Sequence, residues 1–486
     1  MIAKELIDIL EERAKVYGDK VFLINPAQPE NQLTYQALFA MVLERGQELA
    51  QLGVKEGDRV GLPVLGAEQF VPQWLALLSI KAVVVPMPGQ APMSDWQRAL
   101  DAVGARWALT CSEQKWHLSS RNTSILGPRL PHGSYRGGGV VLWTSGTTGE
   151  PKPVGVGTDA LLHTAAQVGH VHRLTPEDVG YSPLPLFHIN GEVVAVLASL
   201  VAGSTIVIPD RFRRTKFWTQ VNDFGATWIN AVPSILAILA TDDSQLSNAR
   251  LLRFVRSASM ALPEVVAERW QKRWDIPIVE TYGLSEAASQ VTANGLDSKD
   301  RRAGSVGRPQ GIALRIVNEN GVVLQPNHRG LVEIKGPSVI DPQWGPNQWA
   351  HSTTRHGWYG TGDVGFVDED GFVYLKGRNR EVINRGGEKI FPREVEEVIR
   401  RFPGLGDCAV VGAPNAILGE EVVAFVVVET ADPESAARRI REYATGLLAA
   451  HKVPSRIIPV TSLPTGSTGK VARRILQQVA GAEIVS

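Results

Sequence analysis

Short apolar runs alternate with segments of helical periodicity over most of the first 330 residues. Apolar runs bounded by turn residues predict buried strands, here over 21–24, 59–65, 82–87, 107–110, 205–209 and 228–232. Helical spacing predicts helices over 35–52, with Thr34 as the N-cap, and over 69–80 and 95–103. Strands separated by helices of this length are typical of parallel α/β sheets.

The pattern changes after about residue 330. Turn-rich, strand-like pieces precede a polar basic stretch at 377–381, and a compact α+β pattern follows it. That pattern predicts helices over 394–402 and 434–449 and strands over 408–412, 422–429 and 456–460. We therefore predict an α/β protein with a large N-terminal domain of several subdomains and parallel sheets, residues 1–379, and a small C-terminal α+β domain, residues 380–486.

Composition narrows the class of protein. The chain has 486 residues, which is too long for one core, and 44% hydrophobic with 21% charged residues is ordinary for a globular protein. Fifty basic and fifty acidic residues cancel, so neither nucleic acid nor an anionic membrane is an expected partner. Cys111 and Cys408 are too few for a disulfide framework. With no long apolar span and an amphipathic N-terminus, a cytoplasmic location without a membrane span is expected.

A loop at residues 144–152 is rich in hydroxyls and glycine and ends on a lysine. Backbone N–H groups, small hydroxyls and one cation within a few residues suit a polyphosphate, although the alternative is an ordinary polar β–α connection. No Gly-Lys-Ser/Thr ends the loop, so it is not a Walker loop and indicates ATP held in another way. The candidate phosphate-binding residues are Thr144, Ser145, Gly146, Thr147, Thr148, Gly149 and Lys152.

Five more segments fit nucleotide chemistry. They are 185–188, 281–286, 359–363, the pair 377–378 with 385–389, and 464–470. In this order, together with the loop, they resemble the core motifs of the adenylate-forming superfamily, which contains acyl-CoA synthetases, peptide-synthetase adenylation domains and luciferases. The resemblance covers nearly the whole chain. It implies a small C-terminal domain that is mobile and carries a catalytic lysine.

The resemblance assigns the nucleoside to two segments. Thr281, Tyr282 and Gly283 would bind adenine, since an aromatic ring with a flanking glycine can stack on a base. Asp363 would accept hydrogen bonds from the ribose hydroxyls, and Arg378 would donate to the same sugar.

The resemblance also assigns the reacting groups. Glu286 would be a catalytic residue and the Mg²⁺ ligand, although it could instead be a carboxylate at a helix N-terminus. Lys470 would neutralise charge at the attacked α-phosphorus, while Lys152 would serve the leaving pyrophosphate. Arg380 occupies the hinge position, so rotation could deliver Lys470. The pair Gly386 and Gly387 would let the pantetheine arm of CoA pass close to the backbone.

The predicted substrate pocket is formed by His188, Asn190, Trp228, Asn230, Ser257 and Ser289. His188 is also a candidate catalytic residue. A histidine that is only packed or hydrogen-bonded is an equally weighted alternative. Amino-acid-activating relatives carry an aspartate there, so His188 argues against an α-amino acid. The stretches 183–191, 253–263 and 383–392 are similar to oxalate- and small-acid–CoA ligases, although Ser289 stands where the oxalate enzymes usually have histidine. A small or medium carboxylic acid is the expected substrate.

Three positions depart from the family pattern. Pro153 replaces a glycine after the loop lysine, Ser285 replaces threonine before Glu286, and Gly360 stands where Arg or Lys is common. None of them removes a charged catalytic group.

The expected reaction therefore joins a carboxylate to ATP as acyl-AMP, releases pyrophosphate and passes the acyl group to CoA, with Mg²⁺ as the metal. Two alternatives remain open at this point. The acceptor could be an amine or the thiol of a separate carrier protein, or the chain could be a non-catalytic nucleotide- or acyl-binding relative. Retention of Lys470 argues against the non-catalytic alternative.

Overall fold

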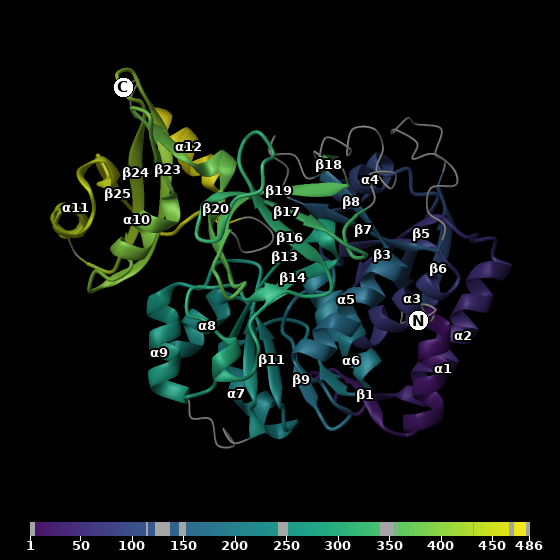
Figure 1. Cartoon of the computed structure of the whole chain (residues 1–486). Helices are drawn as coiled ribbons and strands as arrows, with labels where there is room; N and C mark the ends of the chain where they lie inside the picture. The colour runs from purple at the N-terminus through teal and green to yellow at the C-terminus, as the bar shows by residue number, and fades with distance from the viewer. Residues whose placement is uncertain are drawn as a thin grey trace. The chain divides into compact units, whose positions relative to one another are not determined.

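The chain folds into two compact units, each with its own sheet and core (Figure 1). The computed structural model describes residues 5–112, 115–121, 137–144, 152–241, 251–340, 354–355, 357–430, 432–465 and 471–482. Unit 1 comprises residues 1–259, 270–314 and 334–359, and unit 2 comprises residues 260–269, 315–333 and 360–486. Within the described residues, no helix has the length and hydrophobicity needed to cross a bilayer.

A nine-stranded, mostly parallel sheet forms the centre of unit 1. Its core strands β1, β10, β9, β11, β12 and β13 run parallel, while β2, β14 and β15 are antiparallel at its two ends. In order across the sheet the strands are β15 (Arg308–Pro309), β14 (Ser289–Ala293), β13 (Ile278–Leu284), β12 (Phe254–Ser257), β11 (Trp228–Ala231), β9 (Val179–Tyr181), β10 (Thr205–Val207), β1 (Val21–Ile24) and β2 (Leu33–Thr34).

A second, six-stranded sheet completes unit 1. Its middle strands pair in parallel, and each edge strand is antiparallel to its neighbour. The order is β6 (Lys115–Ser120), β5 (Trp107–Ser112), β3 (Arg59–Val64), β4 (Val83–Pro88), β7 (Gly139–Thr144) and β8 (Lys152–Gly157).

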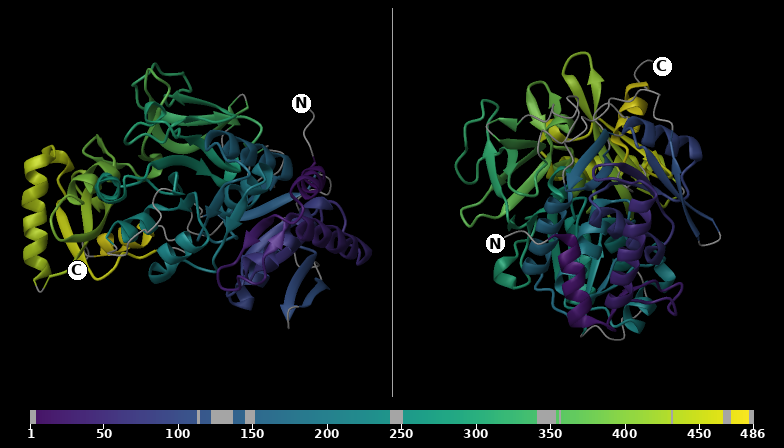
Figure 2. Two further views of the ribbon diagram at one scale, coloured as in Figure 1. Left: turned by 90° about the horizontal axis from the view of Figure 1, so that it is seen from below. Right: turned by 90° about the vertical axis from the view of Figure 1, so that its right-hand side faces the viewer.

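Helices of unit 1 cover both sheets. Figure 1 shows α5 and α6 on one side of the central strands β9 and β11, and α7 and α8 on the other. The N-terminal helices α1 and α2 lie side by side, and α2 also contacts α3 (Figure 2). The bounds are α1 (Leu6–Tyr17), α2 (Tyr35–Gln51), α3 (Ala67–Ser79), α4 (Met93–Ala102), α5 (Thr158–Val171), the π-helix η1 (Asn190–Leu197), α6 (Ala198–Ala202), α7 (Arg214–Asp223) and α8 (Pro233–Ala240). A further helix, α9 (Glu264–Trp274), contains residues of both units.

A five-stranded sheet contains residues of both units, and a further sheet belongs to unit 2 alone. The first has the order β16 (Ala313–Val317), β17 (Gly330–Lys335), β19 (Trp358–Val367) and β18 (Thr354–Arg355), with β20 (Val373–Arg378) also paired to β19. The second has the order β22 (Glu388–Ile390), β21 (Ile383–Arg385), β24 (Gly419–Val428) and β23 (Leu405–Asn415), with β25 (Arg456–Val460) parallel to β24.

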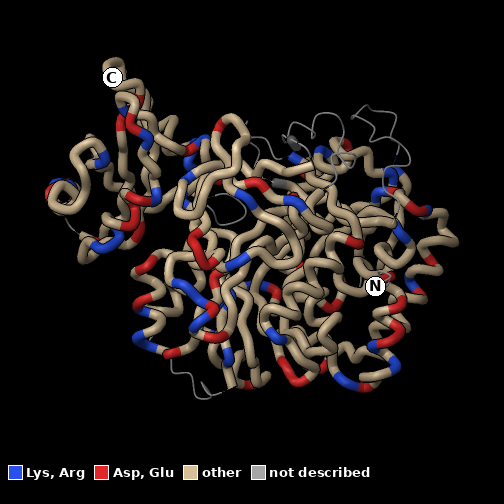
Figure 3. The backbone as a smooth tube through the Cα atoms, viewed as in Figure 1, with Lys and Arg blue, Asp and Glu red and all other residues tan. Residues whose placement is uncertain are grey.

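The sheet of unit 2 buries apolar side chains on both faces. Val395 and Ile440, from α10 (Pro392–Ile399) and α11 (Pro433–Leu447), pack in one cluster. Leu476 of α12 (Arg473–Ala482) packs in a second cluster with other residues of β23 and β24. Charges of both signs are interspersed along the chain (Figure 3), in keeping with the equal numbers of basic and acidic residues.

The predicted fold class is confirmed. All six of the apolar runs predicted as strands before residue 330 are strands, with ends shifted by a few residues. Thr34 caps α2 as predicted, because its side chain accepts a hydrogen bond from the Ala37 N–H at 3.1 Å. The predicted boundary at residue 380 stays a prediction, while the last crossing of the chain between the two compact units falls between Tyr359 and Gly360.

Candidate active site

The predicted phosphate loop closes a β-hairpin. Thr144 ends β7 and pairs with Lys152, which begins β8, so the segment joins two antiparallel strands and is not a connection from a strand to a helix. The two strands also lie close at the end away from the loop, where a Cβ on Gly139 would come within 2.2 Å of the Val156 carbonyl oxygen. Residues 145–151, with Ser145, Gly146, Thr147, Thr148 and Gly149, lie outside the described residues.

Pro153 lies at a position of this hairpin that tolerates proline. Pro153 lies on β8, an edge strand of the six-stranded sheet, and pairs with Trp143 of β7. Replacing Pro153 with Gly should lower the free energy of unfolding by about 1 kcal/mol, because the unfolded chain gains conformational freedom. Urea unfolding measures the change. Pro153→Ala is the matched control and should lose less, so equal losses in both variants would contradict the entropic explanation.

The segment predicted to bind adenine enters a tight, strained turn. Thr281, Tyr282 and Gly283 lie on β13, and the register with β14 shifts between Tyr282 and Gly283. A Cβ on Gly283 would lie 1.4 Å from the Ser289 carbonyl oxygen, so only glycine fits. Ala288 and Ser289 have φ of 51° and 92°, which L-residues rarely adopt. Strained backbone of this kind clusters at functional sites.

Glu286 lies on the 3₁₀ turn η3 (Ser285–Ala287), between these strands. The turn contacts β8, the strand that begins with Lys152, and its Glu286 carbonyl accepts from the Ile340 N–H at 2.8 Å. The candidate metal ligand and the candidate pyrophosphate lysine therefore come from neighbouring elements of unit 1.

The donor set around Glu286 fits magnesium held mainly by substrate. Within the part of the chain that the structure describes, no group of three or more His, Cys, Asp or Glu side chains could enclose a metal ion. Mg²⁺ in nucleotide sites is bound through one or two carboxylates, with phosphate oxygens and water supplying the rest. Glu286, half-buried on its turn, fits that role.

The predicted pocket residues Asn190 and Asn230 meet in a buried polar cluster. Asn230 donates to the Asn190 Oδ1 and to the Ser182 Oγ, both at 3.2 Å. Arg256, only 1% exposed, donates to the Oδ1 atoms of Asn190 and Asn230, both at 3.1 Å, and to the Gln290 Oε1 at 3.2 Å. Asn230 and Arg256 are paired neighbours on β11 and β12, so they project from the same face of the sheet.

The other predicted pocket residues are buried or half-buried in unit 1. Trp228 is fully buried and stacks on Phe254, with ring centroids 5.9 Å apart. Ser257 and Ser289 are also buried. His188 is half-buried, and its ring lies 4.5 Å from that of Phe187. Their roles as pocket or catalytic residues stay predictions.

The candidate ribose-binding residues lie side by side in unit 2. Asp363 of β19 and Arg378 of β20 are register partners, and Arg378 Nε lies 2.7 Å from Asp363 Oδ1. The Thr361 Oγ accepts from the Asp363 N–H at 3.1 Å and donates to the Val332 carbonyl at 3.0 Å. The aspartate is therefore held on both its backbone and its side chain.

The glycine pair predicted to face CoA forms the turn of a hairpin. Gly386 and Gly387 join β21 to β22, with φ of 61° and 93°. Positive φ at both central residues is typical of a type I′ turn, so the backbone conformation itself requires these glycines. The Gly386 N–H donates to the Leu418 carbonyl at 2.7 Å. Arg380, the predicted hinge, lies on the exposed 3₁₀ turn η6 (Asn379–Glu381).

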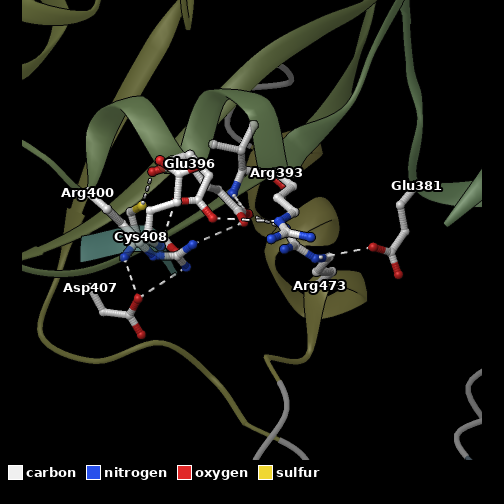
Figure 4. A network of polar contacts seen from close by, with 10 residues as sticks. Glu381, Arg393, Glu396, Arg400, Asp407, Cys408 and Arg473 are labelled. Atoms are coloured by element: carbon white, nitrogen blue, oxygen red, sulfur yellow. Dashed lines mark hydrogen bonds and ion pairs between the residues drawn. The ribbon is translucent and has the colours of Figure 1, made fainter. Parts of the chain in front are cut away.

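Lys470 lies outside the described residues, but the chain that follows it is anchored by a buried carboxylate (Figure 4). Glu396 Oε1 lies 2.7 Å from Arg473 Nη1 and accepts from the Val410 N–H at 2.8 Å. Arg400 lies 3.6 Å from Glu396 Oε2, and Arg473 also lies 3.4 Å from Glu381, beside the predicted hinge.

Electrostatics hold Glu396 ionised. Burial opposes ionisation, but Arg473 and Arg400, with the hydrogen bonds from Arg473 and the Val410 N–H, outweigh it and hold the pKa of Glu396 below its ordinary value. The carboxylate therefore contributes stability that is fully present above its unfolded-state pKa near 4.5 and is lost as pH falls through the lowered folded value.

Replacing Glu396 with Gln should lower the free energy of unfolding of unit 2 by about 3–5 kcal/mol, because Arg473 and Arg400 lose the buried carboxylate that both contact and keep only Glu381 and Asp407 as ion-pair partners. Hydrogen exchange of β23 amides measures the loss, which should shrink as pH falls below 4.5. The control is Glu442→Gln on the exposed side of α11. Equal protection in both variants would show that the Glu396 network contributes nothing.

Arg256, Gln290 and Glu396 were not predicted from the sequence. One signal for Arg256 was available, since an arginine inside the apolar run of β12 requires buried acceptors. Gln290 and Glu396 carry no comparable signal, because their roles depend on partners distant in the sequence.

Comparisons with known proteins agree with this geometry. The chain matches the AMP-binding enzyme family over residues 10–129 and 139–342, and the AMP-binding enzyme C-terminal domain over 394–470. It is 33% identical to the sulfoacetate–CoA ligase of Cupriavidus necator over 96% of both chains. It is 30% identical to the oxalate–CoA ligase of Arabidopsis thaliana over 98% of this chain and 99% of the relative.

A solved structure extends the likeness to the fold. The o-succinylbenzoate CoA synthetase of Bacillus subtilis, in complex with its acyl-adenylate intermediate, matches with a TM-score of 0.82. The two are 25% identical, and the match covers 96% of this chain and 97% of the other. The resemblance predicted from six ordered motifs is confirmed. The chain belongs to the AMP-binding enzyme family of adenylate-forming enzymes.

Proposed function

We propose that the protein is an AMP-forming acid–CoA ligase for a small carboxylic acid. The carboxylate attacks the α-phosphorus of ATP, which gives acyl-AMP and releases pyrophosphate. The thiol of CoA then attacks the acyl carbon, which gives the thioester and releases AMP. The reaction uses Mg²⁺ to neutralise the phosphates.

One observation carries the proposal, which is the strained turn between β13 and β14 in a chain of this family. The turn brings the candidate adenine-binding Tyr282 and the candidate metal ligand Glu286 together, and β8, which begins with Lys152, contacts it. A nucleotide seated there would have its base on Tyr282 and its phosphates toward Glu286 and Lys152.

The size of the acid follows from the relatives and from the buried cluster. The two named relatives act on sulfoacetate and oxalate, which are short acids that each carry a second anionic group. The candidate pocket residues Asn190 and Asn230 are held in a buried polar network. A small acid fits such a network better than a long acyl chain does.

Acid-dependent exchange of pyrophosphate into ATP tests the first half-reaction. We expect exchange with a short acid and little exchange with long-chain fatty acids. Exchange with no acid in a panel of short, aromatic and long-chain acids would overturn the proposal. Exchange followed by acyl transfer to an amine, with none to CoA, would keep the adenylation and overturn the acceptor.

A further inference from the structure

Arg256 is a buried cation whose acceptors are all neutral. It is 1% exposed, and its bonds go to the side-chain oxygens of Asn190, Asn230 and Gln290. Among the described residues no carboxylate forms an ion pair with it. Burial lowers the pKa of Arg256 to about 9, so it stays charged at neutral pH. The cluster therefore holds a positive charge that nothing described there neutralises.

The guanidinium fixes the orientation of two amides. The Asn190 Oδ1 accepts from Arg256 Nη1 at 3.1 Å and from Asn230 Nδ2 at 3.2 Å. The Gln290 Oε1 accepts from Arg256 Nε at 3.4 Å and Nη2 at 3.2 Å. With each oxygen turned toward donors, each NH₂ group is turned away from the guanidinium.

Those two NH₂ groups are buried donors in need of acceptors. Asn190 Nδ2 and Gln290 Nε2 are buried and have no hydrogen-bond partner among the described residues. The amide of Asn230, in contrast, is satisfied by Ser182 and Asn190. Buried polar groups are nearly always paired, so an unpaired pair of donors beside a cation indicates a site for an anionic acceptor.

No neighbouring group supplies that anion. His172 lies beside Gln290 near hydrogen-bonding range without a well-formed hydrogen bond, and burial with the nearby Arg256 charge lowers its pKa to about 3, so its neutral ring brings no negative charge to the Gln290 amide. Glu192 lies two residues after Asn190 on η1, and burial raises its pKa well above the ordinary value, which disfavours a carboxylate there.

The cluster also lies close in the chain to the reacting centre. Gln290 of β14 pairs with Gly283 in the turn that carries Tyr282 and Glu286. Asn190 begins η1 directly after the candidate residue His188 and Ile189. Only short stretches of chain therefore separate both amides from the candidate reacting centre.

We propose that Asn190 Nδ2 and Gln290 Nε2 bind a second anionic group of the substrate, the distal carboxylate or sulfonate of a short acid. Arg256 is the positioning residue that orients both amides and adds its charge. This inference rests on the proposed function. A monoacid with an apolar end would leave both donors unpaired, so it would be a poor substrate.

The test compares acids of matched length with and without the second anion, such as succinate against butyrate and sulfoacetate against propionate. The measurement is kcat/KM for pyrophosphate exchange with the acid that has two anionic groups, divided by kcat/KM with the matched acid that has one. The wild-type ratio should favour the acid with two anionic groups by about 10- to 100-fold. Asn190→Asp, which replaces the donor with a carboxylate of equal size, should lower the ratio by a similar factor, mainly through KM.

Variants of Arg256 separate positioning from folding. Arg256→Lys keeps the charge but lacks the planar fork that orients both amides, so it should lower the preference for the acid with two anionic groups less than Arg256→Gln does. Asn31→Asp, at an exposed position, is the control for the chemical change and should leave exchange unaltered. Thermal unfolding identifies any Arg256 variant that fails to fold. If the Arg256 variants do not fold, the ratio of kcat/KM values measured for Asn190→Asp decides whether the inference holds.

The outcomes distinguish the two proposals. Robust exchange with no preference for the second anionic group, or a ratio unchanged in Asn190→Asp, overturns the inference and leaves the ligase intact. Exchange with no acid at all overturns the ligase, and the inference falls with it. If the wild type prefers acids with a second anionic group and Asn190→Asp abolishes that preference, the result supports both the ligase and the second-anion site.

Discussion

Replacing Lys470 with Ala should lower acid-dependent ATP–pyrophosphate exchange by about 10²–10³-fold, because one charged donor to the pentacoordinate phosphorus is lost. The thioester half-reaction, started from pre-made acyl-AMP and CoA, should remain largely intact. The reason is that Lys470 serves attack at phosphorus, whereas thioester formation attacks the acyl carbon. Parallel assays of the two half-reactions on the same preparation measure the difference.

The matched control is Lys115→Ala on the exposed strand β6, which removes a lysine far from the proposed chemistry in sequence. Its two half-reactions should both equal those of the wild type. Equal loss of both half-reactions in Lys470→Ala would contradict a lysine that acts in adenylation alone. It would also contradict a hinge at Arg380 that brings the lysine into place for only one step.

Gly283→Ala should abolish exchange and destabilise unit 1. The new Cβ would overlap the Ser289 carbonyl oxygen, at 1.4 Å, so β13 and β14 must separate at the bulge. Overpacking a close contact typically costs about 1–3 kcal/mol and occasionally more, and backbone leaves less room to relax than a side chain does. Tyr282 and Glu286 lie on either side of Gly283, so both would move. Binding of AMP by calorimetry, together with urea unfolding, measures the two losses.

Gly169→Ala provides the control for this change. Gly169 lies within α5, and a Cβ there would meet nothing within 4 Å. That variant should bind AMP normally and gain up to about 1 kcal/mol of stability from the better helix former. Normal AMP binding by Gly283→Ala would show that the turn does not present the adenine site.

Local signals allowed most of the fold to be predicted. The strands β1, β3 and β11 are apolar runs bounded by turn residues, and Thr34 is a capping residue followed by a periodic helix. The phosphate loop was less predictable, because a hairpin and a β–α connection both begin with a strand that ends in polar residues. The pairing of Thr144 with Lys152 decides between them, and that pairing depends on the sheet as a whole.

The candidate site divides in the same way. Tyr282, Glu286, Asp363 and Lys470 fall in recognisable motifs, so the sequence alone was enough to propose them as site residues. Arg256 and Gln290 are identified only when β12 and β14 are placed in the sheet, since their bonds join residues 34 positions apart. The need for glycine at position 283 is likewise evident only from the structure, because it depends on the Ser289 carbonyl oxygen that lies beside it.

Product analysis tests the central claim most directly. The protein is incubated with ATP, Mg²⁺, CoA and the short acid that supports the fastest exchange, and the products are identified by mass spectrometry. An acid–CoA ligase gives the acyl-CoA thioester with one AMP and one pyrophosphate for each thioester formed. Release of ADP and phosphate, or AMP formation without a thioester, would contradict the account.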